Sequence, residues 1–308
     1  MAAPVRPAST LTRPPTADLA LLGVAVLFIS SSGPIIAAIA APAMAIAFWR
    51  CLLGSVLTSP WVLLRRRREL LSLSRREVRL IVLAGVLLGA HFATWIPSLR
   101  FTTVASSTAL VATQPVWAAL IARWRGAYIP RSAWIGIAVA LVGVLVLTGI
   151  DLSVDPRHLI GDVLALIGAM LAAAYVTVGE EARRSVSTAT FTTGLYASAA
   201  VLLLVISVIG GQALVGFSLR DWVLIGLLTL GAQLLGHTLI NKVLSTTSAT
   251  VVSLAILFEM PGATVIAAIA LGQFPPWGIL PAVGLMFIGI VLVIRSGSKT
   301  VPSETSPL

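Results

Sequence analysis

A few ionisable side chains lie inside long apolar stretches, where charge is costly and chemistry is therefore expected. Glu259 stands about halfway along one such stretch, and an ionised carboxylate at the centre of a bilayer costs about 2.5–3.5 kcal/mol. The side chain must face protein or water. Burial favours its uncharged form, which suits a proton carrier or a site for an amine, although an interhelical hydrogen bond is an equally simple role. Pro261 is expected to kink the helix and to free a carbonyl nearby.

Arg50 is a second charged residue within an apolar stretch. It lies too deep to be an ordinary anchor at the membrane interface, although its long stem could reach outward. A guanidinium grips a carboxylate with two parallel hydrogen bonds, so Arg50 predicts recognition of an amino acid or an organic acid. A structural contact with backbone carbonyls or with Glu259 explains it as well.

Polar and aromatic side chains recur at a helical spacing of four residues. His91 and Trp95 share one face of a predicted helix, and Gln233 and His237 share a face of its counterpart in the second half. Gln114 is a similar polar residue in an apolar segment. Together these faces predict the lining of a cavity, while simple hydrogen bonding of each side chain is the alternative.

No motif for enzymatic or nucleotide chemistry is present in the sequence. It contains no His-Glu-x-x-His, no Gly-x-Ser-x-Gly, no Cys/His cluster and no Walker loop. The single Cys51 excludes an intramolecular disulfide. We therefore expect no enzyme, no cofactor and no metal, and no pumping driven by ATP on this chain alone.

The elements that must position these residues are membrane-spanning helices. The 308 residues are 58% hydrophobic and 10% charged, with a mean hydropathy of +1.01, whereas soluble domains are about 25% charged. Apolar runs of about 20 residues, the length needed to cross a bilayer, predict an all-α polytopic membrane protein with ten transmembrane helices. Their expected ranges are 19–40, 43–64, 78–98, 102–122, 132–150, 160–179, 190–210, 221–241, 248–271 and 277–295.

Two local features leave alternatives open. Serines at 30–32, followed by Gly33-Pro34, interrupt the first apolar run. They predict either a polar unwound stretch or close helix packing through small residues. The run Arg65–Arg68 fits the topology of a cytoplasmic loop, and recognition of a lipid head group is its second interpretation.

The distribution of Lys and Arg predicts the orientation. With the N-terminus inside, 17 of the 21 basic residues fall on the inner side and three on the outer side. This asymmetry places both termini in the cytoplasm and explains the net charge of +10 without nucleic acid. The tails at 1–18 and 296–308, rich in Pro, Ser and Thr, are expected to be disordered.

A repeat relates residues 104–150 to residues 250–296 at an offset of 146. The matched pairs are Pro115 with Pro261, Gly126 with Gly272, Pro130 with Pro276, and Gly143 with Gly289. Each half has an odd number of predicted helices, so the second half enters the membrane from the opposite side. Two inverted five-helix repeats, 19–150 and 151–295, are therefore expected, an architecture of many secondary transporters.

Several stretches carry a resemblance to a known family. They are FWRCLLGSVL in the second predicted helix, ATQPVWAALIARWRGAYIPRSAWIGIAVALVGVLVL across the fourth and fifth, and LFEMPGATVIAAIALGQFPPWGILPAVGLMFIGIVLVI across the ninth and tenth. The chain resembles the ten-helix EamA transporters of the drug/metabolite transporter superfamily over nearly its whole length. It departs from the family's Gly-Glu pairs at Gly126-Ala127 and Gly272-Gln273, and its Glu-Pro pair is spaced as Glu259-Met260-Pro261.

The resemblance implies a secondary transporter of the cell membrane that moves small metabolites by alternating access through a central cavity. Amino acids or related compounds are the expected substrates, with drugs as a further class, and export is the expected direction. Its partners would be a small-molecule substrate, the lipid bilayer and, as a further candidate, protons. We assign substrate binding to Arg50, His91, Trp95, Gln114, Gln233 and His237, and proton coupling to Glu259. An intramembrane enzyme or a membrane scaffold or receptor is the alternative.

Overall fold

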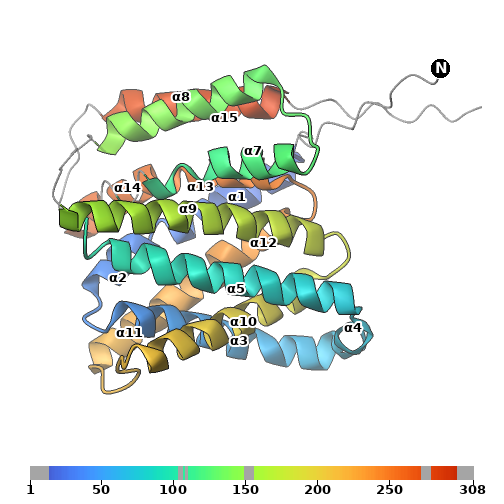
Figure 1. The fold of residues 1–308 in the computed structure, drawn as a ribbon, viewed down its shortest axis with the longest axis vertical. Helices are drawn as coiled ribbons and strands as arrows, with labels where there is room; N and C mark the ends of the chain where they lie inside the picture. The colour runs from blue at the N-terminus through green and yellow to red at the C-terminus, as the bar shows by residue number, and fades with distance from the viewer. Residues whose placement is uncertain (1–13, 103–106, 108–109, 149–155, 272–278, 297–308) are drawn as a thin grey trace, which may run out of the picture.

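The computed structural model describes residues 14–102, 107, 110–148, 156–271 and 279–296, and all regular structure in that part of the chain is helical. The helices lie side by side in a bundle, with their axes running across the view of Figure 1. The first half contains α1 (Thr16–Ile29), α2 (Ser32–Ala38), α3 (Ala43–Arg65), α4 (Arg67–Ser72), α5 (Arg75–Ser98), α7 (Gln114–Trp124) and α8 (Arg131–Thr148). The second half contains α9 (Pro156–Ala182), α10 (Thr188–Ile209), α11 (Leu219–Leu228), the π-helix η1 (Thr229–His237), α12 (Thr238–Val243), α13 (Ala249–Ile256), α14 (Glu259–Leu271) and α15 (Ile279–Ser296).

Six helical segments of the described chain are long and apolar enough to cross a membrane. They are Thr16–Ile36, Ala43–Arg65, Arg75–Ser98, His158–Ala182, Thr188–Ile209 and Leu219–Val243. Shorter apolar helices cover Arg131–Val146, Ala249–Ala263 and Leu280–Ser296. The protein is therefore an all-helical, multi-pass membrane protein. The predicted tails lie mostly outside the described residues, as do Gly272, Gln273 and Pro276 of the predicted repeat.

Local signals set where several helices begin. The side chain of Ser74 accepts a hydrogen bond from the Glu77 backbone N–H, and the Glu77 carboxylate accepts one from the Ser74 backbone N–H. Together they form a capping box at the start of α5. Ser187 and Ser218 cap α10 and α11 in the same way from one side. Each cap satisfies backbone N–H groups that would otherwise lack a partner at the edge of the membrane.

Three segments predicted as continuous helices are interrupted in the structure. The segment 19–40 breaks at Ser30 and Ser31, whose hydroxyls bond the carbonyls of Val26 and Phe28, so the polar break is the alternative that the structure favours. The segment 248–271 breaks before Glu259, because Pro261 has no N–H to continue the helix across the turn. The segment 221–241 contains η1, where the Thr238 N–H bonds the Gln233 carbonyl five residues back.

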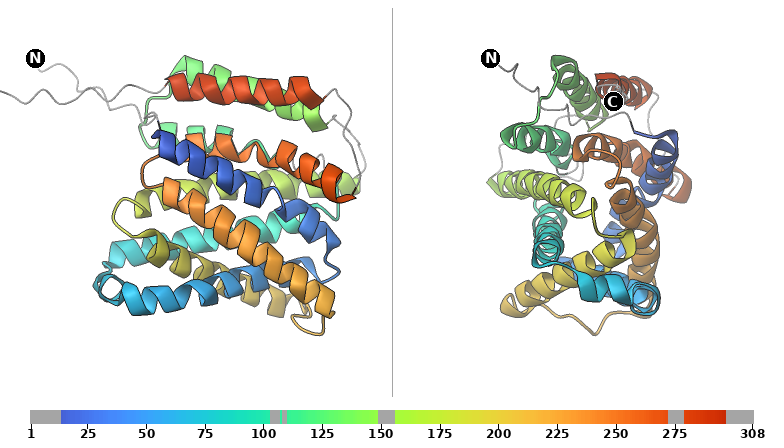
Figure 2. Two further views of the ribbon diagram at one scale, coloured as in Figure 1. Left: turned by 180° about the vertical axis from the view of Figure 1, so that it is seen from behind. Right: turned by 90° about the vertical axis from the view of Figure 1, so that its right-hand side faces the viewer.

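The paired helices α8 and α15 form one edge of the bundle, at the top of Figures 1 and 2. Glycines allow their close approach: a Cβ at Gly143 would lie 2.7 Å from the Ala282 carbonyl oxygen, and one at Gly289 would lie 2.5 Å from the Gly136 carbonyl oxygen. These contacts join low numbers on α8 to high numbers on α15, so the two helices are antiparallel. Small residues give such close packing in membranes, where burial of apolar surface offers little driving force.

Polar contacts gather at the two ends of the bundle. At one end, on the right in Figure 1, Glu181 pairs with Arg76 and, at 3.0 Å, with Arg125. At the other end the Asp221 carboxylate accepts a hydrogen bond of 2.9 Å from the Ala40 N–H, and Thr102 donates to Asp162 over 2.7 Å. Each of these contacts joins the first half of the chain to the second. The two halves are therefore in contact at both ends of the bundle.

Candidate functional site

A small cavity lies inside the bundle at the interface of the two halves. Its volume is about 50 Å³, and its polar and aromatic lining residues are Ser32, His91, Phe92, Trp95, Gln114, Tyr175, His237 and Glu259. A second cavity of about 30 Å³ shares Trp95, Gln114 and Glu259 with it. A water needs roughly 10–15 Å³ by this measure, whereas sites for small molecules are usually about 300 Å³ or more. The cavity has room for a few waters in this conformation and is too small for a metabolite.

Glu259 is the acidic residue of the site. It is the first residue of α14, directly after the break, and its partly buried side chain lines both cavities. None of the described residues hydrogen-bonds its carboxylate. Gly262, one turn later, packs so closely on Ser30 that a Cβ there would collide with the Ser30 hydroxyl. The break between α1 and α2 thus packs against the first turn of α14, and this contact holds Glu259 at the cavity.

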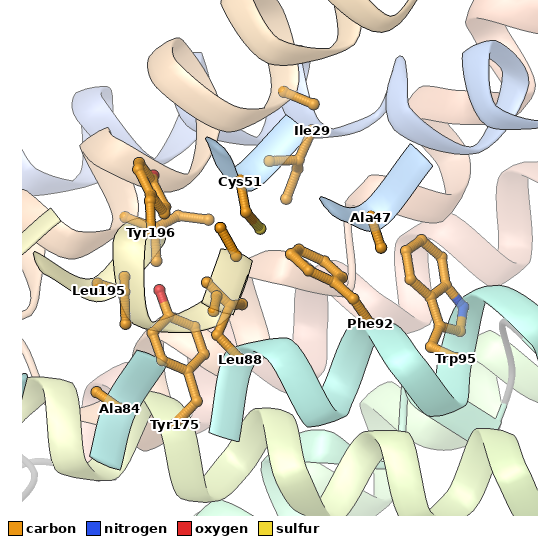
Figure 3. Close-up of a cluster of buried hydrophobic side chains, with 14 of the residues drawn as sticks. Ile29, Ala47, Cys51, Ala84, Leu88, Phe92, Trp95, Tyr175, Leu195 and Tyr196 are labelled. Carbon is orange, nitrogen blue, oxygen red and sulfur yellow. The ribbon is translucent and has the colours of Figure 1, made fainter. Parts of the chain in front are cut away.

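Arg50 is fully buried on α3, behind the wall of the cavity. Its Nε donates a 2.9 Å hydrogen bond to Gln233 Oε1, and its guanidinium carbon lies 4.4 Å from the centre of the Phe92 ring. Both terminal nitrogens, Nη1 and Nη2, lack a hydrogen-bond partner among the described residues. Phe92 lines the cavity whereas Arg50 does not. In Figure 3 the Phe92 ring extends from α5 toward Ala47 and Cys51 on α3, the helix that carries Arg50.

His91 and Trp95 lie on a common face of α5. Their rings stack with centroids 5.6 Å apart and an angle of 9° between the planes, and both line the cavity. His91 Nδ1 lies 2.9 Å from the Gly168 carbonyl oxygen. Since a carbonyl only accepts, Nδ1 carries a proton and donates this hydrogen bond. Trp95 Nε1 is buried and has no partner among the described residues.

Gln233 and His237 belong to η1 and face the same region. His237 lines the cavity, its ring meets Phe92 edge-on at 6.0 Å, and its buried Nδ1 has no partner within the described chain. Gln233 instead holds Arg50 from behind the wall and approaches Cys51 Sγ at 3.9 Å. Gln114 on α7 lines both cavities and donates a 2.9 Å hydrogen bond to Ser253 Oγ on α13.

Some residues of this region carry little signal in the sequence. Tyr175 on α9 lines the cavity and donates a hydrogen bond to Asn241, and Tyr196 on α10 donates to the Gln233 carbonyl over 2.9 Å. Both tyrosines are buried in the core (Figure 3). A polar aromatic in an apolar helix is the signal that identified His91, and it applies equally to Tyr175. Phe92 has no such signal, since an apolar ring in an apolar helix is ordinary.

A larger polar pocket of about 240 Å³ opens at the Glu181 end of the bundle. Arg125, Glu180, Arg184 and Ser248 lie in its lining, and Glu180 Oε2 accepts a 3.0 Å hydrogen bond from the Ala249 N–H at the start of α13. The described residues contain no group of three His, Cys, Asp or Glu side chains that could hold a metal ion.

Comparisons with known proteins agree with this architecture. The model of the EamA-like transporter family matches residues 18–149 and 159–295, one match in each half. A crystal structure described only as "Crystal structure of protein" shares the fold, with a TM-score of 0.75 at 16% sequence identity, over 92% of this chain and 98% of that one. No curated protein matches the sequence.

Proposed function

Because the chain belongs to the EamA-like transporter family of the drug/metabolite transporter superfamily, we propose that it is a secondary transporter that exports small metabolites. Amino acids or related compounds are the proposed substrates. The observation that carries this proposal is a cavity between the two halves that Glu259 lines, with Arg50 behind Phe92 in its wall and both terminal nitrogens of Arg50 without a partner among the described residues. A zwitterion presents one group to each of these charges.

Alternating access is the proposed mechanism. The two halves would separate first at one end and then at the other, breaking either the Glu181 contacts or those of Asp221 and Asp162. Separation enlarges the cavity, which is too small for a metabolite in the closed state. Movement of Phe92 would then expose Arg50 to the substrate carboxylate.

An inverted repeat of five helices in each half supports this mechanism. At the offset of 146 residues, α3 corresponds to α10, α5 to the segment from α11 to α12, and α8 to α15. The Gly143–Ala282 contact corresponds at the same offset to the Gly289–Gly136 contact with the halves exchanged. Antiparallel α8 and α15 are the relation expected of halves inserted in opposite directions.

The proposed orientation places both termini in the cytoplasm and the protein in the cell membrane. The Glu181 end collects the basic stretches that the charge distribution assigns to the inner side, among them Arg65–Arg68, Arg76 and Arg125. The 240 Å³ pocket at this end would be the cytoplasmic entrance.

Flux measurements in proteoliposomes test the proposal. We expect exchange of labelled amino acids that responds to a pH gradient, and we expect Glu259→Gln to lose the response to pH because the amide cannot carry a proton. Arg50→Gln should lower exchange of amino acids more than exchange of the corresponding amines without a carboxylate. Wild-type flux that ignores pH, together with unchanged flux in Glu259→Gln, would refute the coupling role. Absence of exchange for amino acids, purines and small drugs would refute the transport proposal itself.

A further inference from the structure

A further concavity lies apart from the pockets described above. It has a volume of about 390 Å³ and is formed by α3, α4, α5 and α10, and we call it the α4 groove. It shares no lining residue with the central cavity. On α5 the groove uses Val78, Ile81 and Val82, whereas the cavity uses Leu88 to Trp95, so the two sites lie at different levels of the same helix.

The α4 groove offers an apolar surface. Leu63, Leu70, Ile81 and Val82 contribute to its walls. The hydroxyl groups among its lining residues are used within the protein: Ser198 donates to the Gly194 carbonyl over 2.8 Å, and Thr193 donates to Thr58 over 2.8 Å. Ser59 donates to the Val56 carbonyl, and the Thr190 hydroxyl accepts a hydrogen bond from the Ser187 hydroxyl. An occupant of this groove therefore needs a hydrocarbon segment.

The chain between two residues that line the α4 groove, Leu63 and Leu70, is strongly basic. Four consecutive arginines, Arg65–Arg68, run from the end of α3 into α4, and Leu70 and Leu73 follow them into the groove. Arg65 lies over the Trp61 ring at 5.7 Å. The exposed side chains of Arg66, Arg67 and Arg68 form no ion pair with any described residue. The adjacent carboxylate of Glu69 is directed elsewhere, because its Oε1 accepts a hydrogen bond of 2.6 Å from the Ser187 N–H.

From this combination we infer that the α4 groove binds an anionic phospholipid, with an acyl chain in the groove and the phosphate at Arg66–Arg68. Topology alone requires basic residues in the loop but no apolar groove beneath them. The charge complementarity distinguishes an anionic lipid from a zwitterionic one, whose head group carries its own cation. Because α3 and α5 belong to the first half and α10 to the second, the lipid would touch both halves and bias their relative movement.

Native mass spectrometry of the full chain in detergent tests this inference. Titration with phosphatidylglycerol and with phosphatidylethanolamine of the same acyl chains should show one site that prefers phosphatidylglycerol by about tenfold or more. Substituting Arg66, Arg67 and Arg68 together by Gln should remove the preference. The matched control substitutes Arg123, Arg131 and Arg295 by Gln, which removes the same charge away from the groove and should keep the preference.

A groove-filling substitution tests the apolar part independently. Ala197→Trp places an indole in the α4 groove and should reduce retention of phosphatidylglycerol about tenfold or more. Val201→Trp on the same helix faces outward, is absent from the groove lining, and should bind lipid like the wild type.

Equal binding of the two lipids to the wild type would overturn the inference, as would full retention of phosphatidylglycerol by Ala197→Trp. Displacement of the lipid by millimolar inorganic phosphate would also overturn it, since the site would then recognise the phosphate without the acyl chain. These outcomes concern lipid binding only, so they leave the proposed transport activity to its own flux assay.

Discussion

At the level of single residues, Phe92 separates the Arg50 guanidinium from the cavity. Burial of a guanidinium with two unpartnered nitrogens is costly, and the contact with the Phe92 ring offsets part of that cost, about 0.5–2 kcal/mol for a cation over an aromatic face. The aromatic face is a weaker partner than a carboxylate. A substrate that carries a carboxylate is therefore expected to displace the ring.

Phe92→Ala should expose Arg50 to the cavity. We expect tighter binding of amino acids, since the ring no longer competes, but slower exchange, because a substrate that is bound more tightly is released more slowly. Binding of amines without a carboxylate should not tighten. Equilibrium binding and counterflow in proteoliposomes measure the two effects. Phe191→Ala, which removes an equally buried ring elsewhere in the core, controls for lost packing.

The sequence predicted the site at residues whose polarity conflicts with their apolar surroundings. Five of these residues line the cavity in the structure, namely His91, Trp95, Gln114, His237 and Glu259. Substrate binding was also predicted for Arg50 and Gln233, yet these two side chains lie behind the lining of the cavity. Whether a polar side chain lines a cavity or lies behind a neighbour depends on how helices that are distant in sequence pack together. A single sequence does not contain that information.

At the level of elements, the interruptions in the helices were only partly predictable. Serines and Pro34 indicated the break after α1, and Pro261 indicated the kink before α14. The π-helix η1 has no Gly-Pro signal of this kind. Its geometry is supported by a tertiary contact, the hydrogen bond from the Tyr196 hydroxyl to the Gln233 carbonyl, so it depends on how α10 packs.

Tyr196→Phe should destabilise η1. Loss of one buried hydrogen bond is worth about 1 kcal/mol, which corresponds to roughly fivefold faster hydrogen exchange in peptides covering 229–238. Exchange measured by mass spectrometry on the purified protein provides the test. Tyr175→Phe, whose hydroxyl bonds Asn241 outside η1, is the matched control and should leave those peptides unchanged. Equal acceleration in both variants would mean that Tyr196 has no specific role in the π-helix.

At the level of the whole molecule, polar contacts join the two halves at both ends of the bundle. Glu181 contacts Arg76, Arg125 and Arg184, with Arg76 75% exposed and Glu181 15% exposed. Exposed ion pairs are weak, about 0.2–1 kcal/mol each. The contact between the halves at this end therefore consists of several weak ion pairs, each of which costs little free energy to separate.

Glu181→Gln should favour opening at its own end. Cys51 is the single cysteine, is fully buried and lies beside Arg50, so its alkylation reports opening of the central region. We expect alkylation by a membrane-impermeant maleimide, applied from the Glu181 side, to accelerate about two- to fivefold. Asp221→Asn should instead accelerate labelling from the opposite side. Faster labelling from both sides in either variant would indicate general loosening, contrary to this prediction.

The repeat at an offset of 146 residues has a consequence for the balance between the two open states of the proposed mechanism. His91 corresponds to His237 and Pro115 to Pro261, so these positions are the same in both halves, whereas Arg50 corresponds to Tyr196 and Glu259 to Thr113. In a carrier with identical halves, the states open to either side would have equal energy by symmetry. Any preference for one state must therefore originate where the halves differ. Exchanging Arg50 with Tyr196 and Glu259 with Thr113 would move each charge to the position that the repeat relates to it, and is expected to invert whatever part of the preference these two charges cause.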